Sequence, residues 1–190
     1  MSLYYVRHGQ TEWNRLGKYQ GKSDIPLNET GRQQAIKTRS CLEGIKIDHV
    51  YCSPLKRAKE TAAIIMGPSK LEMTEDVRLM ERSFGCFEGC QASDIVSDLW
   101  VYSDHVPYVG SESTAQFFAR VYACMEELVK AAKTKNILVV AHGGVGIPVQ
   151  CFFQQVDLKA DLTYLIPKNC EVISFDTLDV QTVLPASIGV

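Results

Sequence analysis

The amino-acid sequence predicts an α/β fold, in which a doubly wound, mostly parallel sheet is covered by helices on both faces. Two observations lead to this prediction. Short apolar runs of β-favouring residues occur at 3–6, 50–52 and 137–141, and such runs are typical of strands buried on both faces of a parallel sheet. Segments with helical periodicity lie between these runs, and strands that alternate with helices indicate a doubly wound sheet.

The composition of the chain indicates one domain. Its 190 residues are 46% hydrophobic and 22% charged, which is close to the averages of globular proteins. No internal repeat, low-complexity tract or linker interrupts the sequence. We therefore expect a single domain over residues 1–190.

Charge and hydropathy exclude several classes of partner. The formal net charge is -2, and the lysines and arginines are scattered, so we expect no nucleic acid and no anionic membrane surface as a partner. No stretch approaches about 18 consecutive apolar residues, and the first residues lack a basic start followed by an apolar run. We expect neither secretion nor a membrane span, and a cytoplasmic location.

The first strand-like run ends in Arg7 and His8, and helical segments follow it. Thr30 and Gln33 have the spacing of a capping box, so a helix is expected to begin at Thr30 and to run toward Gly44.

A second helix is expected directly after the apolar run 50–52. Ser53 can cap it, and Pro54 can take its first position without losing a hydrogen bond. The helix should stop at Gly67 and Pro68, which break helices.

A longer helix is expected to begin around Ser113, with Gln116 at capping-box spacing. Its apolar residues recur at intervals of three and four, which predicts a buried stripe. We interpret this stripe as core and not as a cofactor-binding surface: Phe117, Phe118, Val121, Met125, Leu128, Val129 and Ala132.

Charged side chains follow the predicted strands at their carboxyl ends. Arg7 and His8 end the first run, His142 follows the run 137–141, and Arg57 lies one turn beyond the run 50–52. Ligands of doubly wound sheets bind in the crevice beyond these strand ends. We therefore expect two histidines and two arginines to meet in one crevice.

This set of side chains suits a phosphate group. Two guanidiniums offer forked donors to a tetrahedral oxyanion, and the amino end of the helix after Ser53 adds partial positive charge. An imidazole with a pKa of about 6.5 is mostly neutral at neutral pH and can attack phosphorus. Such covalent catalysis divides one difficult displacement into two easier ones.

The departing alkoxide needs a general acid on the far side of the phosphorus. Residues 79–89 supply Glu81 and Glu88 in a glycine-punctuated loop. Burial, or the negative charge of the phosphate, must raise the pKa of such an acid. We assign the acid to Glu81 and expect Glu88 to pack or to cap locally.

Five blocks in this order resemble the histidine phosphatase superfamily, which has the phosphoglycerate-mutase-like fold. The blocks are YYVRHGQTEWN (4–14), QGKSDIPLNETGRQQA (20–35), YCSPLKRAKETA (51–62), LMERSFGCFEG (79–89), and VVAHGG (139–144) with a later KNCEV (168–172). The resemblance covers nearly the full length, and it implies a mostly parallel sheet with an antiparallel strand near the end, for which Val172–Phe175 is the candidate.

The resemblance also implies roles for single residues. His8 would be the nucleophile that becomes phosphohistidine, and Glu81 would be the proton donor. Arg7, Arg57 and His142 would complete the phosphate pocket, while Asn14 and Gln20 match positions that line the pocket and touch phosphate or substrate.

The sequence favours the phosphatase branch over a mutase. Residues 83–119 contain no lysine or arginine, whereas phosphoglycerate mutases place basic residues there to hold the substrate carboxylate. The segment FGCFEG also resembles the phosphatase branch. In the lid segment, residues 90–110, Trp100, Tyr102 and Tyr108 can either enclose a leaving group or pack the lid itself.

We therefore expect a metal-independent phosphomonoesterase that acts on a small phosphorylated metabolite through a phosphohistidine, with no cofactor. Two alternatives stay open: a shortened phosphoglycerate mutase, and a non-catalytic protein that binds a phosphorylated ligand. The sequence predicts neither the substrate nor the oligomeric state.

The remaining histidines and the cysteines are expected to be structural. His49 lies beside a strand and His105 in a polar loop, where we expect structural or surface roles. The seven cysteines are odd in number and form no C-x-x-C pair, so we expect reduced, buried thiols and no zinc site: Cys41, Cys52, Cys86, Cys90, Cys124, Cys151 and Cys170.

Overall fold

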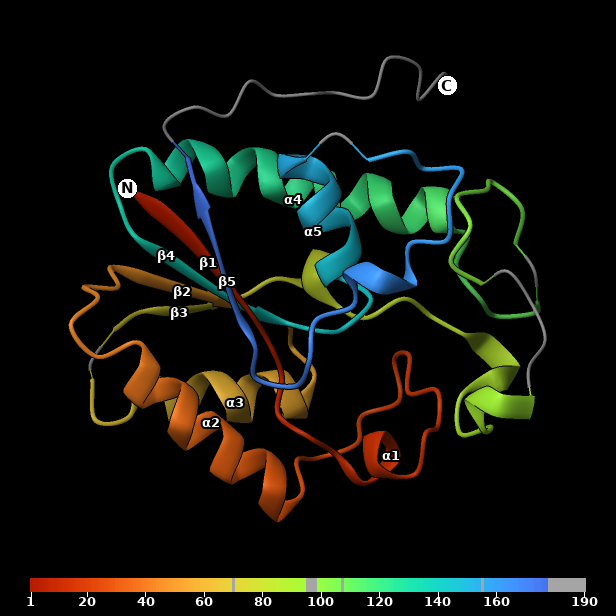
Figure 1. The fold of residues 1–190 in the computed structure, drawn as a ribbon, viewed down its shortest axis with the longest axis horizontal. Helices are drawn as coiled ribbons and strands as arrows, with labels where there is room; N and C mark the ends of the chain where they lie inside the picture. Colours follow the sequence, from red (N-terminus) through yellow and green to blue (C-terminus); the bar gives the residue numbers. More distant parts are fainter. Residues whose placement is uncertain (70, 95–98, 107, 155, 178–190) are drawn as a thin grey trace.

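The computed structural model of this chain describes residues 1–69, 71–94, 99–106, 108–154 and 156–177. Its centre is a five-stranded sheet with the strand order β3-β2-β4-β1-β5. The strands cross the middle of the molecule, and helices lie above and below them (Figure 1). The strands are β1 (Ser2–Arg7), β2 (His49–Cys52), β3 (Met73–Glu75), β4 (Ile137–Ala141) and β5 (Val172–Asp176).

The sheet is mixed, as predicted. Strand β4 lies between β2 and β1 and is parallel to both, and β3 is parallel to β2. Strand β5 runs antiparallel to β1, with Val172 opposite Val6. The sequence does not predict β3, because its three residues are partly exposed and carry no apolar run.

Helices cover both faces of the sheet, which confirms the predicted fold class. Helices α2 (Glu29–Cys41) and α3 (Lys56–Met66) lie below the sheet in Figure 1, and α4 (Thr114–Ala132) and α5 (Gly146–Phe153) lie above it. The short α1 (Glu12–Arg15) follows β1. Single turns of 3-10 helix occur at Val77–Leu79, Gly85–Phe87, Ala92–Asp94 and Thr163–Leu165.

Each face of the central strands contributes to a separate core, because successive side chains of a strand point to opposite faces. On β4, Ile137 and Val139 pack with α4 and α5, while Leu138 and Val140 pack with the α3 side. Every residue of the predicted stripe on α4 is buried. Ser113 caps α4 and forms the predicted capping box with Gln116.

Two predicted helix starts are wrong. Helix α2 begins at Glu29 and not at Thr30, because the side chain of Asn28 accepts the Gly31 N–H and so caps the helix. Helix α2 also ends at Cys41, before Gly44.

Helix α3 begins at Lys56, after Leu55, and has no side-chain cap. Ser53 is therefore not its cap and Pro54 is not its first residue, because the Ser53 hydroxyl accepts the Leu55 N–H and is joined to His142. The predicted stop is confirmed, since α3 ends at Met66 and Gly67 takes a positive φ of 57°.

All seven cysteines are free thiols. Burial raises the pKa of the Cys52 thiol to about 11 and that of the Cys124 thiol to about 12. The prediction of buried thiols is wrong for three positions, which lie at the end of α2 or in the loop around residues 86–90: Cys41, Cys86 and Cys90. Across the described ranges, every helix is too short or too polar to cross a lipid bilayer.

Candidate active site

Pairing of β1 with β4 brings the two predicted histidines together. Arg7 is the register partner of Ala141, so the next residues, His8 and His142, emerge side by side from parallel strands. The His8 N–H donates to the Ala141 carbonyl at 2.9 Å. The two imidazoles meet edge to face, with ring centroids 5.2 Å apart and an interplanar angle of 63°.

The loop after β1 is held closely against the first turn of α2. A Cβ on Gly31 would overlap the backbone of Gln10, and a Cβ on Gly9 would overlap the Gly31 carbonyl. Two glycines therefore permit this backbone contact, which fixes the chain that carries His8.

Arg57 reaches His8 from the first turn of α3. Its guanidinium is fully buried and donates from Nε to His8 Nε2 at 3.2 Å. Its other nitrogens donate to the carbonyls of Ser23 and Gly21, each at 2.8 Å. Both carbonyls thus aim the guanidinium at the imidazole.

These contacts define the tautomer of His8. The carbonyl of Gly9 accepts from Nδ1 at 2.7 Å, so Nδ1 carries the proton. Nε2 accepts from Arg57 and therefore presents its lone pair. The pKa of His8 lies well below its ordinary value because of burial first and the cations Arg57 and Arg7 second. The imidazole is neutral at neutral pH.

The two arginines stay charged at neutral pH. Burial lowers the pKa of Arg57 to about 10, and it also lowers the pKa of Arg7. The Arg7 guanidinium donates to the Pro167 carbonyl at 2.7 Å. Two positive charges thus flank one neutral imidazole.

His142 is fully buried beside His8, and its Nε2 is joined to Ser53 Oγ at 2.7 Å. Burial, followed by the charge of Arg57, holds the pKa of His142 well below its ordinary value. The Tyr5 hydroxyl donates to the His142 carbonyl.

Two buried nitrogens in this cluster have no hydrogen-bond partner. Among the buried side-chain nitrogen and oxygen atoms of the described residues, only Arg7 Nε and His142 Nδ1 lack one. Buried polar groups are almost always hydrogen-bonded, since an unsatisfied group costs about 1–3 kcal/mol. Both nitrogens therefore keep a hydrogen-bonding capacity that the described residues do not use.

Glu81 lies on another wall of the same site, with a side chain that is nearly buried. Its carboxylate accepts the backbone N–H groups of Gly144 and Arg82, each at 2.9 Å. A Cβ on Gly144 would overlap both the Glu81 carboxylate and the Trp100 ring. Glycine at position 144 thus lets the loop after β4 contact the carboxylate directly.

Asn14 and Gln20 are linked to the site through Thr11. The Thr11 hydroxyl donates to Gln20 Oε1 at 2.9 Å and to Asn14 Oδ1 at 3.2 Å. Asn169 donates to the His8 carbonyl at 2.9 Å and to Asn14 Oδ1 at 3.4 Å.

A cavity of about 470 Å³ opens in front of these groups. His142 does not line it and instead lies behind, packed against His8. All the other predicted site residues are in its walls: Arg7, His8, Asn14, Gln20, Arg57 and Glu81.

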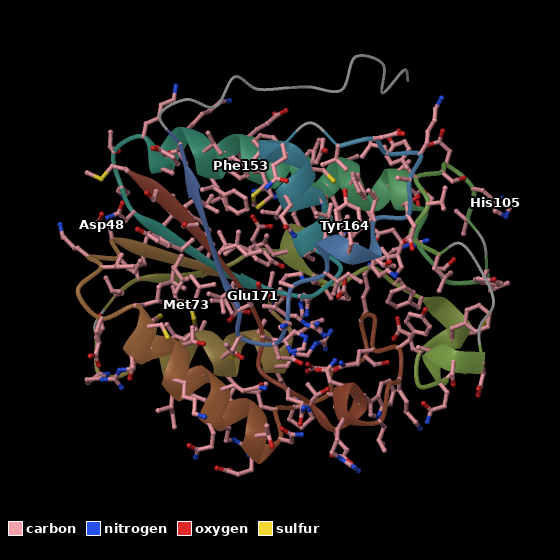
Figure 2. All side chains as sticks on the ribbon, in the orientation of Figure 1. Asp48, Met73, His105, Phe153, Tyr164 and Glu171 are labelled. Atoms are coloured by element: carbon pink, nitrogen blue, oxygen red, sulfur yellow. The ribbon has the colours of Figure 1, made fainter. Side chains whose placement is uncertain are left out.

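The remaining acidic and histidine candidates lie outside the cavity walls. Glu88 accepts the N–H group of Phe84, as expected of a local cap, and it also accepts those of Lys22 and Ser23, which are distant in the sequence. His49 pairs with Thr74 Oγ1 at 2.8 Å. Figure 2 shows His105 at the outer edge of the molecule, where it is exposed.

Sequence reasoning misses two residues that support the site. The local pattern assigns Ser53 to a helix cap, although its hydroxyl is the partner of His142. Asn169 belongs to the KNCEV block, but only the spatial structure shows that it holds the His8 carbonyl. In the lid segment, Trp100 lines the cavity, while residues 95–98 and 107 lie outside the described residues.

Comparisons with known proteins agree with this geometry. The chain is 30% identical to phosphoserine phosphatase 1 of Hydrogenobacter thermophilus over 188 residues, which cover 95% of the chain and 87% of that protein. It is 40% identical to phosphoglycerate mutase-like protein 4 of Arabidopsis thaliana over 153 residues, or 75% of the chain and 66% of that protein.

A solved structure has the same fold. The α-ribazole phosphatase of Shigella flexneri superposes with a TM-score of 0.79 at 27% identity, over 93% of this chain and 90% of that one. The family model of the histidine phosphatase superfamily (branch 1) matches residues 3–185. The resemblance carried by the five sequence blocks is thus confirmed, and the chain belongs to the histidine phosphatase superfamily, branch 1.

Proposed function

We propose that residues 1–190 form one catalytic domain, a metal-independent phosphomonoesterase that hydrolyses a small phosphorylated metabolite through a phosphohistidine at His8. One observation carries this proposal. A neutral imidazole presents its Nε2 lone pair beside the buried guanidinium of Arg57 and the partly exposed guanidinium of Arg7, and the buried Nε of Arg7 lacks a partner.

In the first step, the Nε2 lone pair of His8 attacks phosphorus. The N–P bond forms, the P–O bond to the alcohol breaks, and the alkoxide takes a proton from Glu81. In the second step, water loses a proton to Glu81 and attacks phosphorus, which releases His8 and inorganic phosphate.

Donor groups of the two arginines fit the phosphoryl oxygens. The Arg7 and Arg57 guanidiniums balance the charge of a phosphate dianion. Arg7 lines the cavity and its Nε has no other partner, so an oxygen atom of the substrate would satisfy it, whereas His142 packs against His8 behind the cavity wall. Nε of Arg57 becomes free for a further oxygen once His8 Nε2 bonds to phosphorus.

The position of Glu81 in the cavity wall supports its role as the acid. Among the described residues it is the glutamate that lines the cavity, and its side chain is nearly buried. The other loop glutamate, Glu88, is occupied by backbone N–H groups outside the cavity walls.

Support for hydrolysis over mutase transfer comes from the charges of the cavity. A mutase must hold a second anionic group while the substrate reorients. Beyond Arg7 and Arg57, Lys18 is the only cationic side chain among the described lining residues. The name of the Hydrogenobacter relative also points to a small phosphorylated metabolite as substrate.

Phosphate release tests this function. The purified protein is incubated in EDTA with phosphorylated sugars, glycolytic acids, amino acids and nucleotides, and wild type is compared with His8→Ala. We expect release by wild type, loss in His8→Ala, and retention in the matched control His105→Ala, because His105 is exposed and lies outside the cavity walls.

Three results would contradict the proposal. Full activity of His8→Ala would show that His8 is not the nucleophile. Exchange between the 2- and 3-phosphates of glycerate with little phosphate release identifies a mutase. Binding of phosphate or vanadate without turnover of any ester identifies a non-catalytic protein.

A further inference from the structure

The cavity extends beyond the corner that fits a phosphate group. Its volume of about 470 Å³ is in the range of small-molecule sites, which is about 300–1,000 Å³. Away from His8 and the arginines, its walls are mainly apolar and aromatic. The aromatic wall, as we call this part, consists of Tyr19, Phe84, Leu99, Trp100 and Ile166.

We propose that the aromatic wall is a leaving-group subsite that selects phosphate monoesters whose alcohol carries a flat, uncharged ring. This selectivity rests on the proposed function, because the roles of His8 and Glu81 determine that the alcohol of the substrate points toward the aromatic wall.

Packing holds the aromatic wall in place. The rings of Tyr19 and Phe84 lie 4.7 Å apart, and Phe84 and Trp100 meet edge to face at 5.7 Å. The Arg82 guanidinium stands 5.7 Å from the Trp100 ring and 5.8 Å from the Phe84 ring. A wall fixed in this way loses little conformational entropy when a ligand stacks on it.

Arg82 is itself anchored to the protein backbone. It is buried, donates from Nε to the Glu112 carbonyl at 2.8 Å, and donates to the Leu99 carbonyl next to Trp100. Arg82 does not line the cavity, so its charge serves the wall rather than a ligand.

The aromatic wall lies beside the proposed acid. The Glu81 carboxylate and the Trp100 ring approach the same backbone atom, because a Cβ on Gly144 would overlap both. An ester oxygen that takes a proton from Glu81 therefore leaves its carbon substituent next to the indole. Aromatic rings stack favourably on such a surface.

The charges of the cavity argue for an uncharged leaving group. Beyond Arg7, Arg57 and Glu81, the ionic side chains of the described lining are Lys18 and Asp161. They have opposite signs, and Asp161 is exposed with its carboxylate occupied by the Thr163 N–H and hydroxyl at 3.0 and 2.9 Å. Exposed ionic groups contribute little to binding in water.

Two esters with the same leaving oxygen test the subsite. Adenosine 5′-monophosphate and ribose 5-phosphate both release a primary ribose oxygen, and only the former carries a flat base. We expect kcat/KM to be about tenfold or more higher for the nucleotide, because stacking of one base is of this size. Phosphoserine is the third substrate, since its amine and carboxylate match Asp161 and Lys18.

Variants of Trp100 show whether the wall causes the preference. Trp100→Leu should bring the ratio of the two kcat/KM values close to one, and Trp100→Phe should keep most of it. Tyr102→Leu is the matched control, since Tyr102 packs on Phe118 and does not line the cavity, and it should keep the wild-type ratio.

Binding to His8→Ala provides a readout that needs no turnover. Calorimetry should give a Kd for adenosine 5′-monophosphate about tenfold lower than for ribose 5-phosphate, by the same stacking contribution. This result, together with no hydrolysis by wild type, would contradict the proposed function and leave the subsite standing. Three results would overturn the proposed subsite. These are equal kcat/KM and Kd values for the two esters, an unchanged ratio of the kcat/KM values in Trp100→Leu, and a higher kcat/KM for phosphoserine.

Discussion

His8 owes its chemical state to three neighbours. The Gly9 carbonyl accepts the hydrogen bond of Nδ1–H, Arg57 donates to the lone pair of Nε2, and Arg7 adds a second cation. Positive charge close to an imidazole disfavours its protonation, and burial acts in the same direction. The proposed nucleophile is therefore neutral over a wider range of pH than a free histidine.

Arg57→Met should raise the pKa of His8. The substitution removes the nearest positive charge, and the protonated imidazole then loses one source of repulsion. NMR titration of the His8 ring protons in the free protein measures the shift. Arg39→Met, a change of the same kind near the end of α2, serves as control and should leave His8 unchanged. A lower or constant His8 pKa in Arg57→Met would contradict the electrostatic explanation.

Glu81→Gln should slow hydrolysis of sugar phosphates far more than hydrolysis of nitrophenyl phosphate. A sugar alkoxide needs a proton as it departs, whereas a nitrophenolate scarcely does, and positioned acids contribute about 10²–10⁴-fold to rate. Steady-state kinetics with both substrates measures the difference. Equal slowing of the two substrates would assign the proton to another group.

At the scale of elements, Glu88 holds the loop that aims Arg57. Its carboxylate accepts the Lys22 N–H at 3.0 Å, the Ser23 N–H at 2.9 Å and the Ser23 hydroxyl at 2.6 Å. The carbonyls of Gly21 and Ser23 in turn accept from Arg57. An unbroken series of hydrogen bonds thus leads from Glu88 to His8.

Glu88→Gln should lower kcat by about tenfold with a smaller change in the free energy of unfolding. An amide has one acceptor oxygen where the carboxylate has two, so contacts to the loop are lost and Arg57 is positioned less well. Steady-state kinetics and urea unfolding measure the two effects. Glu75→Gln, which changes an exposed ion pair with Lys59, is the control and should have wild-type kcat. An unaltered kcat in Glu88→Gln would show that the loop does not need this brace.

The capping box of α4 should contribute measurably to stability. Ser113→Ala removes the side chain that accepts the Gln116 N–H at 3.1 Å, and loss of such a cap costs about 1 kcal/mol. Urea unfolding compares it with Ser40→Ala, an exposed position inside α2 that should change stability by only a few tenths of that amount. Equal stability of the two variants would mean that tertiary packing alone holds the start of α4.

At the scale of the whole molecule, the two buried histidines link folding to pH. Their pKa values lie well below the ordinary value of about 6.5 in the folded protein, whereas the unfolded chain has ordinary values. At pH values between the folded-state and unfolded-state pKa values of the histidines, the unfolded state binds more protons than the folded state. The free energy of unfolding therefore rises with pH. The stabilisation is fully present above about pH 6.5 and is lost as pH falls below it.

The free energy of unfolding should therefore fall by up to about 1.4 kcal/mol per pH unit for each buried histidine below about pH 6.5. Urea unfolding at neutral and at mildly acidic pH measures the slope. His142→Gln removes one of the two groups and should make the dependence less steep. A stability that stays constant or rises as the pH is lowered would contradict the assignment of neutral buried histidines.

The strand runs and the stripe on α4 could be predicted because their pattern reflects burial, and burial of apolar side chains is what stabilises those segments most. The first residues of helices α2 and α3 could not be predicted from such a pattern. Asn28 and Thr30 are both good caps by residue type, and the choice between them depends on which one reaches a free N–H group. Ser53 has the local features of a cap, but a partner from a distant strand takes its hydroxyl.

The order of residue types along the chain is enough to predict the superfamily, the parallel core of the sheet, and the side chains at its carboxyl edge. Each of these follows from residue type and order along the chain. Four properties of the site are visible only in the folded protein: the tautomer of His8, the place of His142 behind the cavity wall, the two nitrogens without partners, and the contacts of Glu88. These properties arise from contacts between residues far apart in the chain, and their distances and burial exist only after the strands have paired.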